Sequence, residues 1–213
     1  MMFGLWQAHL ALALFLFLLT APLGTAPRWQ ALRLALAVGL TFVPVDGLSL
    51  AMVVRSFTHD LSTSLLVLLA GFTLMRFGVV TIHARHQRDL LLAVSILALV
   101  LYPASLGLSY LDPFRWGYEP GWLLLAMALL TLGFLLTGNG LGAATLLIAT
   151  LAYALRGDGS GNYWNYLIDP LLALYAWLFC LNWAVRVAIR RLRALRPSAG
   201  TARHTRDLAE VDR

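Results

Sequence analysis

The chain has 213 residues, of which 60% are hydrophobic and 12% charged, and its mean hydropathy is +0.77. A soluble domain of this size needs more polar material to cover its surface, so the composition excludes one. All 16 basic residues are arginines, because the sequence contains no lysine, and against 10 acidic residues they give a formal net charge of +6. Together with the heavy use of leucine and alanine, this arginine bias is typical of a GC-rich bacterial gene.

The charged residues are clustered along the chain. Between the clusters lie apolar stretches of about 15 to 21 residues, close to the length that crosses a bilayer as a helix. We therefore predict an all-α polytopic transmembrane bundle over residues 1–189, followed by a basic cytoplasmic tail over 190–213 that is partly disordered. The predicted spans are residues 3–23, 34–54, 61–82, 90–110, 121–137, 141–155 and 170–189.

The second predicted span contains a carboxylate, Asp46, in "FVPVDGLSL". Asp46 lies about 20 Å along a helix from Arg33, roughly two-thirds of the way across a bilayer. Because Pro44 and Gly47 weaken a helix here, one interpretation is a broken helix with an intramembrane carboxylate, which is a functional site by default. The alternative is a span that ends just before Asp46, which then caps an interfacial helix running to about Phe57. Asp46 is the leading candidate among the charged residues.

The loop between the third and fourth predicted spans contains His83 and His86, three residues apart. This spacing suits a metal or haem, but no second pair lies at a matching depth. We expect solvated histidines there, no metal site and no cofactor. The single cysteine, Cys180, falls inside the last span and is expected to be a small apolar filler.

The sequence "YLDPFRWGYEPGW" separates the fourth and fifth predicted spans. Asp112 is about one membrane thickness from Asp89 along a helix, so the Asp112-Pro113 pair is expected to begin a turn at the outer interface. Trp116, Tyr118 and Trp122 then form an interfacial aromatic belt. The fifth and sixth spans are short and are joined by "GNG", so they either cross as a tight hairpin or form a re-entrant one.

The last predicted span follows "NYWNYLIDP". Asp-Pro is a good helix start, because Asp accepts from free backbone N–H groups and Pro tolerates the first helical position. We therefore expect Asp169 to be a helix cap at the outer interface. Tyr163, Trp164 and Tyr166 before it are expected to belong to the aromatic belt.

The distribution of arginine sets the predicted orientation. Arginines are frequent after the first, third and seventh spans and sparse in the other loops, so the N-terminus is outside and the C-terminus is cytoplasmic. The last helix is expected to continue into the anionic lipid surface, where each arginine contributes about 1 kcal/mol. The arginines expected to contact that surface are Arg186, Arg190, Arg191 and Arg193.

Most of the remaining polar side chains fall on the predicted outer face. The candidate cluster is Asp46, His59, Asp60, Asp112, Arg115, Arg156 and Asp169. Such a mixture suits a lipid headgroup, a sugar or the loops of a partner protein. All loops are short, so no extramembrane domain is expected to carry out chemistry.

We therefore expect a non-catalytic accessory subunit of a complex in the bacterial inner membrane, acting on envelope lipids or polysaccharide. Its expected partners are membrane lipids, with anionic headgroups at the tail, and other membrane subunits, but no nucleic acid. The alternatives are a membrane-embedded transferase or hydrolase acting on a lipid-linked substrate at the outer face, and a small transporter.

Overall fold

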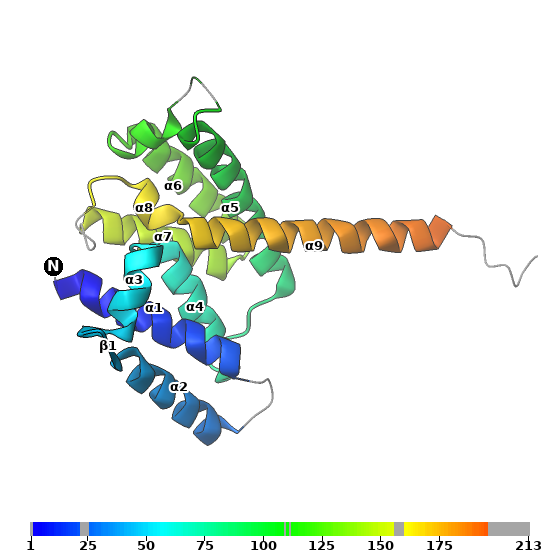
Figure 1. Cartoon of the computed structure of the whole chain (residues 1–213). Helices are drawn as coiled ribbons and strands as arrows, with labels where there is room; N and C mark the ends of the chain where they lie inside the picture. Colours follow the sequence, from blue (N-terminus) through cyan, green and yellow to red (C-terminus); the bar gives the residue numbers. More distant parts are fainter. Residues whose placement is uncertain (1, 22–25, 109, 111, 156–159, 196–213) are drawn as a thin grey trace, which may run out of the picture. The chain divides into compact units, whose positions relative to one another are not determined.

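The computed structural model describes residues 2–21, 26–108, 110, 112–155 and 160–195. Over these residues the chain forms nine α-helices, one short 3-10 helix and a hairpin of two very short strands (Figure 1). The predicted all-α class is confirmed. Two of the described helical segments, Ala84–Ser105 and Pro170–Ala194, have the length and hydropathy of a membrane span, and four further apolar helices are shorter. The fold thus indicates membrane association, whereas seven full-length spans are not seen in the described part of the chain.

The chain divides into two units, Met1–Trp177 and Leu178–Arg213. Helix α9 (Pro170–Leu195) begins in the first unit and continues into the second. It extends past residue 189, as expected for an arginine-rich extension of the last span. The arginines predicted to contact the lipid surface are exposed on the C-terminal part of α9: Arg186, Arg190, Arg191 and Arg193.

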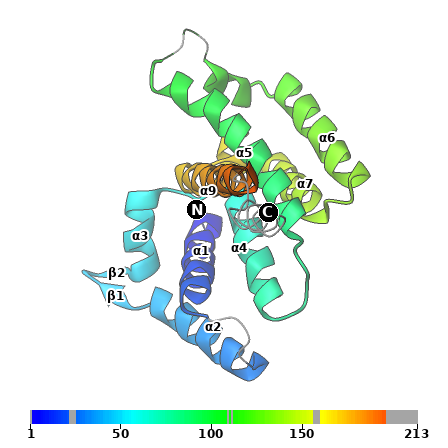
Figure 2. The ribbon, with the colours of Figure 1, turned by 90° about the vertical axis from the view of Figure 1, so that its right-hand side faces the viewer.

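The first two helices, α1 (Met2–Thr20) and α2 (Pro27–Thr41), pack side by side as an antiparallel pair (Figure 2). Their contact is apolar and is built on Phe17, Ala21 and Ala37. Between helices in a bilayer such a contact is stabilised by close packing rather than by transfer from water, because lipid tails are as apolar as these side chains.

The predicted second span, residues 34–54, is wrong as one helix. Helix α2 ends at Thr41, and strands β1 (Pro44–Val45) and β2 (Leu48–Ser49) form a hairpin before α3 (Leu50–Thr58). Asp46 and Gly47 are the two turn residues, with φ of 49° and 83°. Asp-Gly is a preferred pair for such a turn, because both residues must adopt positive φ. Asp46 is exposed at the hairpin tip.

Asp46 does not cap the following helix either. Ser49 does so, because its hydroxyl accepts a hydrogen bond from the backbone N–H of Met52 at 3.4 Å. Both interpretations of Asp46 as part of a helix are therefore corrected, although a span that ends early and a short helix after it are both present. The physical reason is the Asp-Gly turn, which satisfies the backbone without a helix.

Helices α4 (Thr63–Arg76), α5 (Ala84–Ser105), α6 (Gly121–Leu136) and α7 (Gly140–Ala154) overlap predicted spans, and α5 begins six residues before the predicted start at residue 90. The 3-10 helix η1 (Pro113–Gly117) precedes α6, and α8 (Trp164–Leu167) precedes α9. Helix α7 packs against α4, α5, α6 and α8, so it lies at the centre of the first unit.

The tip of the α6–α7 hairpin reaches the first turn of α5. Asn139 donates from its side-chain amide to the backbone oxygen of His86 at 3.0 Å, and its own side-chain oxygen accepts from Gly142 N–H at 2.9 Å, capping α7. The ring of Phe134 occupies the space next to Gly142, where an added Cβ would lie 2.6 Å from the ring. The tip of the hairpin is thus tightly packed, and α7 contacts α5.

The helices of the first unit share two opposite ends. At one end, which we call the Asp169 end, His9 contacts Thr41 and Ser62 contacts Asp169. At the other, the His86 end, Asn139 bonds to His86, and the guanidinium of Arg76 on α4 donates to the backbone oxygen of Ala21. The chain therefore passes back and forth between these two ends.

Candidate functional site

The segment 162–169, "NYWNYLID", is buried at the Asp169 end except for the exposed Asn165. Tyr163, Trp164 and Tyr166 are at most 2% exposed, so their assignment to an interfacial belt is wrong. The reason is that their polar atoms find partners inside the protein, which removes the advantage of headgroup water. Trp164 donates from its indole N–H to the oxygen of Pro113 at 2.8 Å, and the hydroxyl of Tyr166 donates to the oxygen of Ser160 at 3.2 Å.

Tyr163 is bound by a hydroxyl on α7. Its hydroxyl lies 2.5 Å from Thr150 Oγ1, and Thr150 gives its own hydrogen to the oxygen of Leu146. Tyr163 is therefore the donor in this pair. Burial raises the pKa of the Tyr163 phenol above its ordinary value of 10.0, so the phenol stays neutral and keeps this donor.

The segment also fits closely against η1. Asn162 donates from its side-chain amide to the oxygen of Phe114 at 3.0 Å, and the backbone N–H of Tyr163 donates to the oxygen of Gly117 at 2.8 Å. A Cβ added to Gly117 would overlap the side-chain oxygen of Asn162 and lie 2.8 Å from the ring of Trp164. Only glycine leaves room for this approach.

Asp169 caps α9 as predicted, because its Oδ1 accepts from the backbone N–H of Leu172 at 2.8 Å. It does not lie at an exposed interface, since the residue is 4% exposed. Its other oxygen, Oδ2, accepts both the backbone N–H and the hydroxyl of Ser62, at 2.8 and 2.6 Å. Ser62 in turn accepts from Leu65 N–H and caps α4. One carboxylate thus ties the first turns of two helices together.

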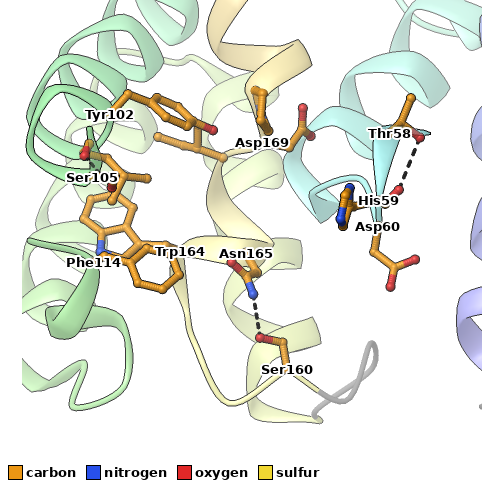
Figure 3. Close-up of a pocket in the computed structure, with 13 residues that line it drawn as sticks. Thr58, His59, Asp60, Tyr102, Ser105, Phe114, Ser160, Trp164, Asn165 and Asp169 are labelled. Carbon is orange, nitrogen blue, oxygen red and sulfur yellow. Dashed lines mark hydrogen bonds between the residues drawn. The ribbon is translucent and has the colours of Figure 1, made fainter. Parts of the chain in front are cut away.

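A cavity of about 650 Å³ opens beside Asp169 (Figure 3). One wall comes from the end of α3 and the link to α4, with His59 and Asp60. The opposite wall comes from α5, η1 and α8, with the rings of Tyr102 and Trp164. The cavity therefore combines segments that are far apart in the sequence.

Asp60 is held by a neighbouring arginine. Arg55 donates from Nε to Oδ1 at 2.6 Å and from a terminal nitrogen to Oδ2 at 2.8 Å. This two-point geometry is the strong form of the pair. The hydrogen bond from Arg55 to Asp60 raises the pKa of the guanidinium. The positive charge of Arg55 and the negative charge of Asp60 therefore neutralise each other beside the cavity.

The main chain at His59 is strained. Its φ is 59° and its ψ is −164°, a region that is essentially restricted to glycine and costs of order 1–3 kcal/mol for other residues. His59 ends α3, and its backbone N–H is bonded to the oxygen of Arg55. The strain places the imidazole beside the cavity between Thr58 and Asp60 (Figure 3).

Of the predicted outer cluster, the structure brings together His59, Asp60 and Asp169 at the cavity. Asp46 lies at the hairpin tip, and Asp112 caps η1 by accepting from Arg115 N–H at 3.3 Å. None of these three residues lines the cavity, and both Asp112 and Arg115 are exposed. Arg156 lies outside the described residues.

The sequence interpretation missed several cavity residues. Tyr102 and Ser105 fall within the predicted fourth span, and neither Phe114 nor Asn165 is among the candidate site residues. The only available signal was position, since each lies within a turn of a helix end that belongs to the same outer side. Ser62, which binds Asp169, was also missed, although a serine just before an apolar run is a typical helix cap.

The two histidines of the predicted loop lie at the start of α5. The rings of His83 and His86 have centroids 5.2 Å apart. Among the described residues, no group of three or more His, Cys, Asp or Glu side chains is placed to hold a metal ion.

No family model, no curated protein and no solved structure matches this chain.

Proposed function

We propose that the protein is a non-catalytic accessory subunit of a complex in the bacterial inner membrane, and that it takes part in handling envelope lipids or polysaccharide. In this proposal the chain crosses seven times, with its N-terminus outside and its C-terminus in the cytoplasm. The Asp169 end then faces outward, and the exposed arginines of α9 contact anionic headgroups of the inner leaflet.

The orientation is supported by the arginines at the two ends of the first unit. Arg76 and Arg88 lie toward the His86 end, together with Arg28, Arg33 and Arg85, whereas the described arginines toward the Asp169 end are Arg55 and Arg115. The bond from Asn139 to His86 supports a full crossing of the α6–α7 hairpin, because it brings the hairpin tip to the level of the first turn of α5.

The observation that carries the non-catalytic role is the use of the cavity carboxylates. Asp169 receives three donors from helix starts, and Asp60 receives two from Arg55. A general acid or base needs a proton that it can exchange with a substrate, and its hydrogen bonds must be free to change. These two acids instead stabilise the fold around a cavity, which suits binding.

Purification tests this role directly. The protein, tagged and expressed at its native level, is extracted in a mild detergent, and co-eluting proteins are identified by mass spectrometry. We expect a membrane protein to co-elute in a fixed ratio. Elution of the chain alone, as a single species, would contradict an accessory role.

The topology has its own test. A phosphatase that is active only outside the cytoplasm is fused after Asp158 or after Arg88 of the truncated chain. We expect activity after Asp158 and none after Arg88. The reverse result would overturn the orientation and everything that depends on it.

A second candidate function is a membrane-embedded transferase or hydrolase that acts on a lipid-linked substrate. The strained main chain at His59 favours it, because strain of this kind gathers at functional sites. Replacing His59 by Gly and by Gln separates the two functions. An enzyme that uses the imidazole loses activity in both variants, whereas a binding subunit keeps its complex in both and gains stability from Gly.

A further inference from the structure

We propose that the cavity beside Asp169 binds an uncharged, hydroxyl-rich headgroup, namely the sugar ring of a glycolipid or of a lipid-linked saccharide. This inference rests on the proposed function, since it requires the Asp169 end to face the outer leaflet. It adds the chemical class of the ligand and the side chains that recognise it.

The dimensions of the cavity suit such a group. Its volume of about 650 Å³ lies in the usual range of about 300–1,000 Å³ for small-molecule sites. It is bounded by the ends of helices at the proposed outer interface, the depth at which lipid headgroups lie. A cavity of this volume has room for a sugar ring and the first atoms of its lipid.

Asp169 supplies the buried acceptor. An ionised carboxylate has about four acceptor positions, and the three donors from Ser62 and Leu172 leave one. A hydroxyl group is the natural fourth donor, because it adds a hydrogen bond without adding a charge. In surroundings of low dielectric this bond is stronger than in water.

Besides His59 and Asp60, the wall carries several side-chain amides and hydroxyls. Ser105 gives its hydrogen to the oxygen of Leu101 at 2.9 Å, so its own oxygen remains an acceptor. Asn165 donates to Ser160 Oγ at 2.7 Å, and both side chains line the cavity (Figure 3). These neutral side chains can donate and accept hydrogen bonds, and the hydroxyls of a sugar ring can do the same. The two sets of groups are therefore complementary.

The wall opposite His59 is aromatic. Tyr102, Phe114 and Trp164 lie together on the side formed by α5, η1 and α8 (Figure 3). The C–H face of a sugar ring is apolar and packs against aromatic rings, while its hydroxyls point to the edge. The cavity therefore has an apolar wall for the face of the ring and polar groups for its rim.

The charges argue against an anionic headgroup. Asp169 would repel a phosphate, and Arg55, the arginine bonded to a cavity residue, already has two hydrogen bonds to Asp60. A phosphate bound to the remaining N–H groups of Arg55 would lie close to the Asp60 carboxylate, which repels it. An uncharged headgroup avoids both costs.

The test uses the purified full-length protein in a detergent without a sugar headgroup. It is titrated with monohexosyl-diacylglycerol, and binding is followed by tryptophan fluorescence and by thermal stability. Parallel titrations use diacylglycerol, phosphatidylglycerol and phosphatidylethanolamine with the same chains, and maltose as a free saccharide. We expect saturable binding of the glycolipid. Binding of maltose as well identifies the ring as sufficient, and binding of the glycolipid alone identifies a lipid-anchored sugar.

A pair of matched variants locates the site. Ser105→Phe fills the cavity from an exposed position, and Ser56→Phe is its control, because Ser56 is also an exposed helix serine whose hydroxyl donates to a backbone oxygen of its own helix. We expect Ser105→Phe to weaken glycolipid binding about tenfold or more and Ser56→Phe to leave it unchanged. Asn165→Ala, at another exposed cavity position, is expected to weaken it as well and serves if Ser105→Phe does not fold.

Equal binding of diacylglycerol or of either phospholipid would overturn the proposal, and so would unchanged glycolipid binding in both folded cavity variants. These outcomes are distinct from failure of the accessory role. If partner proteins co-elute with the wild type but no glycolipid binds, the ligand is wrong and the accessory role stands. If glycolipid binds but no partner co-elutes, the accessory role is wrong.

Discussion

Two aromatic segments lie at the Asp169 end, and their aromatic side chains differ in exposure. In residues 112–122, Trp122 is 85% exposed, and Trp116 and Tyr118 are exposed as well. In residues 162–169, Trp164 is 2% exposed, and its two tyrosine neighbours are fully buried. Both segments contain an Asp-Pro or lead into one. The local sequence is therefore similar, while the surroundings are not.

The difference lies in where the polar atoms of each segment find partners. Asp112 accepts from Arg115, three residues away, so its hydrogen bond serves only its own turn. Asp169 accepts from Ser62, which is distant in sequence, and Trp164 donates to Pro113 in the other segment. The buried segment links helices, whereas the exposed one covers the surface. Aromatic content alone thus does not identify a membrane belt.

The largest expected difference is between the two tryptophans. Trp164→Ala removes a buried ring and its hydrogen bond, so we expect a loss of about 3–5 kcal/mol. Trp122→Ala removes an exposed ring and is expected to change stability by less than about 0.5 kcal/mol. Unfolding in detergent, followed by circular dichroism, measures both. Equal losses of stability in the two variants would contradict the difference in burial between the two segments.

Gly117 tests the contact between the segments. Gly117→Ala forces Asn162 and Trp164 to move, because its Cβ overlaps the Asn162 side chain, and overpacking of this kind costs about 1–3 kcal/mol or more. The control is Gly121→Ala at the start of α6, where an added Cβ meets nothing within 4 Å. Comparable unfolding temperatures for the two variants would contradict the close fit.

The two aspartates come next. Asp169→Asn replaces one carboxylate oxygen by an amide that cannot accept, so a donor of Ser62 or of Leu172 loses its partner. We expect a loss of about 1–3 kcal/mol. Asp112→Asn keeps an acceptor for Arg115 N–H at an exposed turn and is expected to be nearly neutral. Chemical denaturation of both variants gives the comparison. A harmless Asn at 169 would mean that Ser62 contributes little.

The smallest effect concerns the tyrosine hydroxyls. Tyr163→Phe loses the bond to Thr150, which is worth about 0.5–1.5 kcal/mol, and Tyr118→Phe loses a hydroxyl on an exposed residue. Because burial raises the folded pKa of Tyr163, its contribution is complete below the unfolded pKa and is lost as the pH rises through the folded one. Thermal unfolding below and above the ordinary pKa of 10.0 measures this. In Tyr163→Phe the unfolding temperature should fall less with rising pH than it does in the wild type.

Much of the helical content could be predicted because it depends on local sequence. Apolar runs mark the helices, and the Asp-Pro pair marks the start of α9. The hairpin at Asp46 was also readable, since Asp-Gly between apolar residues is a strong hairpin signal. The expectation of a full-length span outweighed it. Length is therefore a weaker guide than turn chemistry at this position.

The buried segment and the cavity could not be predicted from local sequence. Asp169 as a cap alone tolerates Asn, because either residue serves as an N-cap. Its second oxygen matters only when Ser62 lies next to it, and that depends on how α4 and α9 pack. The cavity likewise needs the ends of α3 and α5 to meet α8. Such contacts are set by tertiary packing and leave no periodic pattern in the sequence.

The bond between Ser62 and Asp169 also sets an order of events during synthesis. The two residues are separated by 107 positions, so at about 5–20 residues per second Ser62 leaves the ribosome about 5–20 s before Asp169. During this interval the start of α4 lacks the acceptor that Asp169 provides, and the link between α4 and α9 forms only when the last helix arrives. A chain interrupted before residue 169 therefore never forms this link.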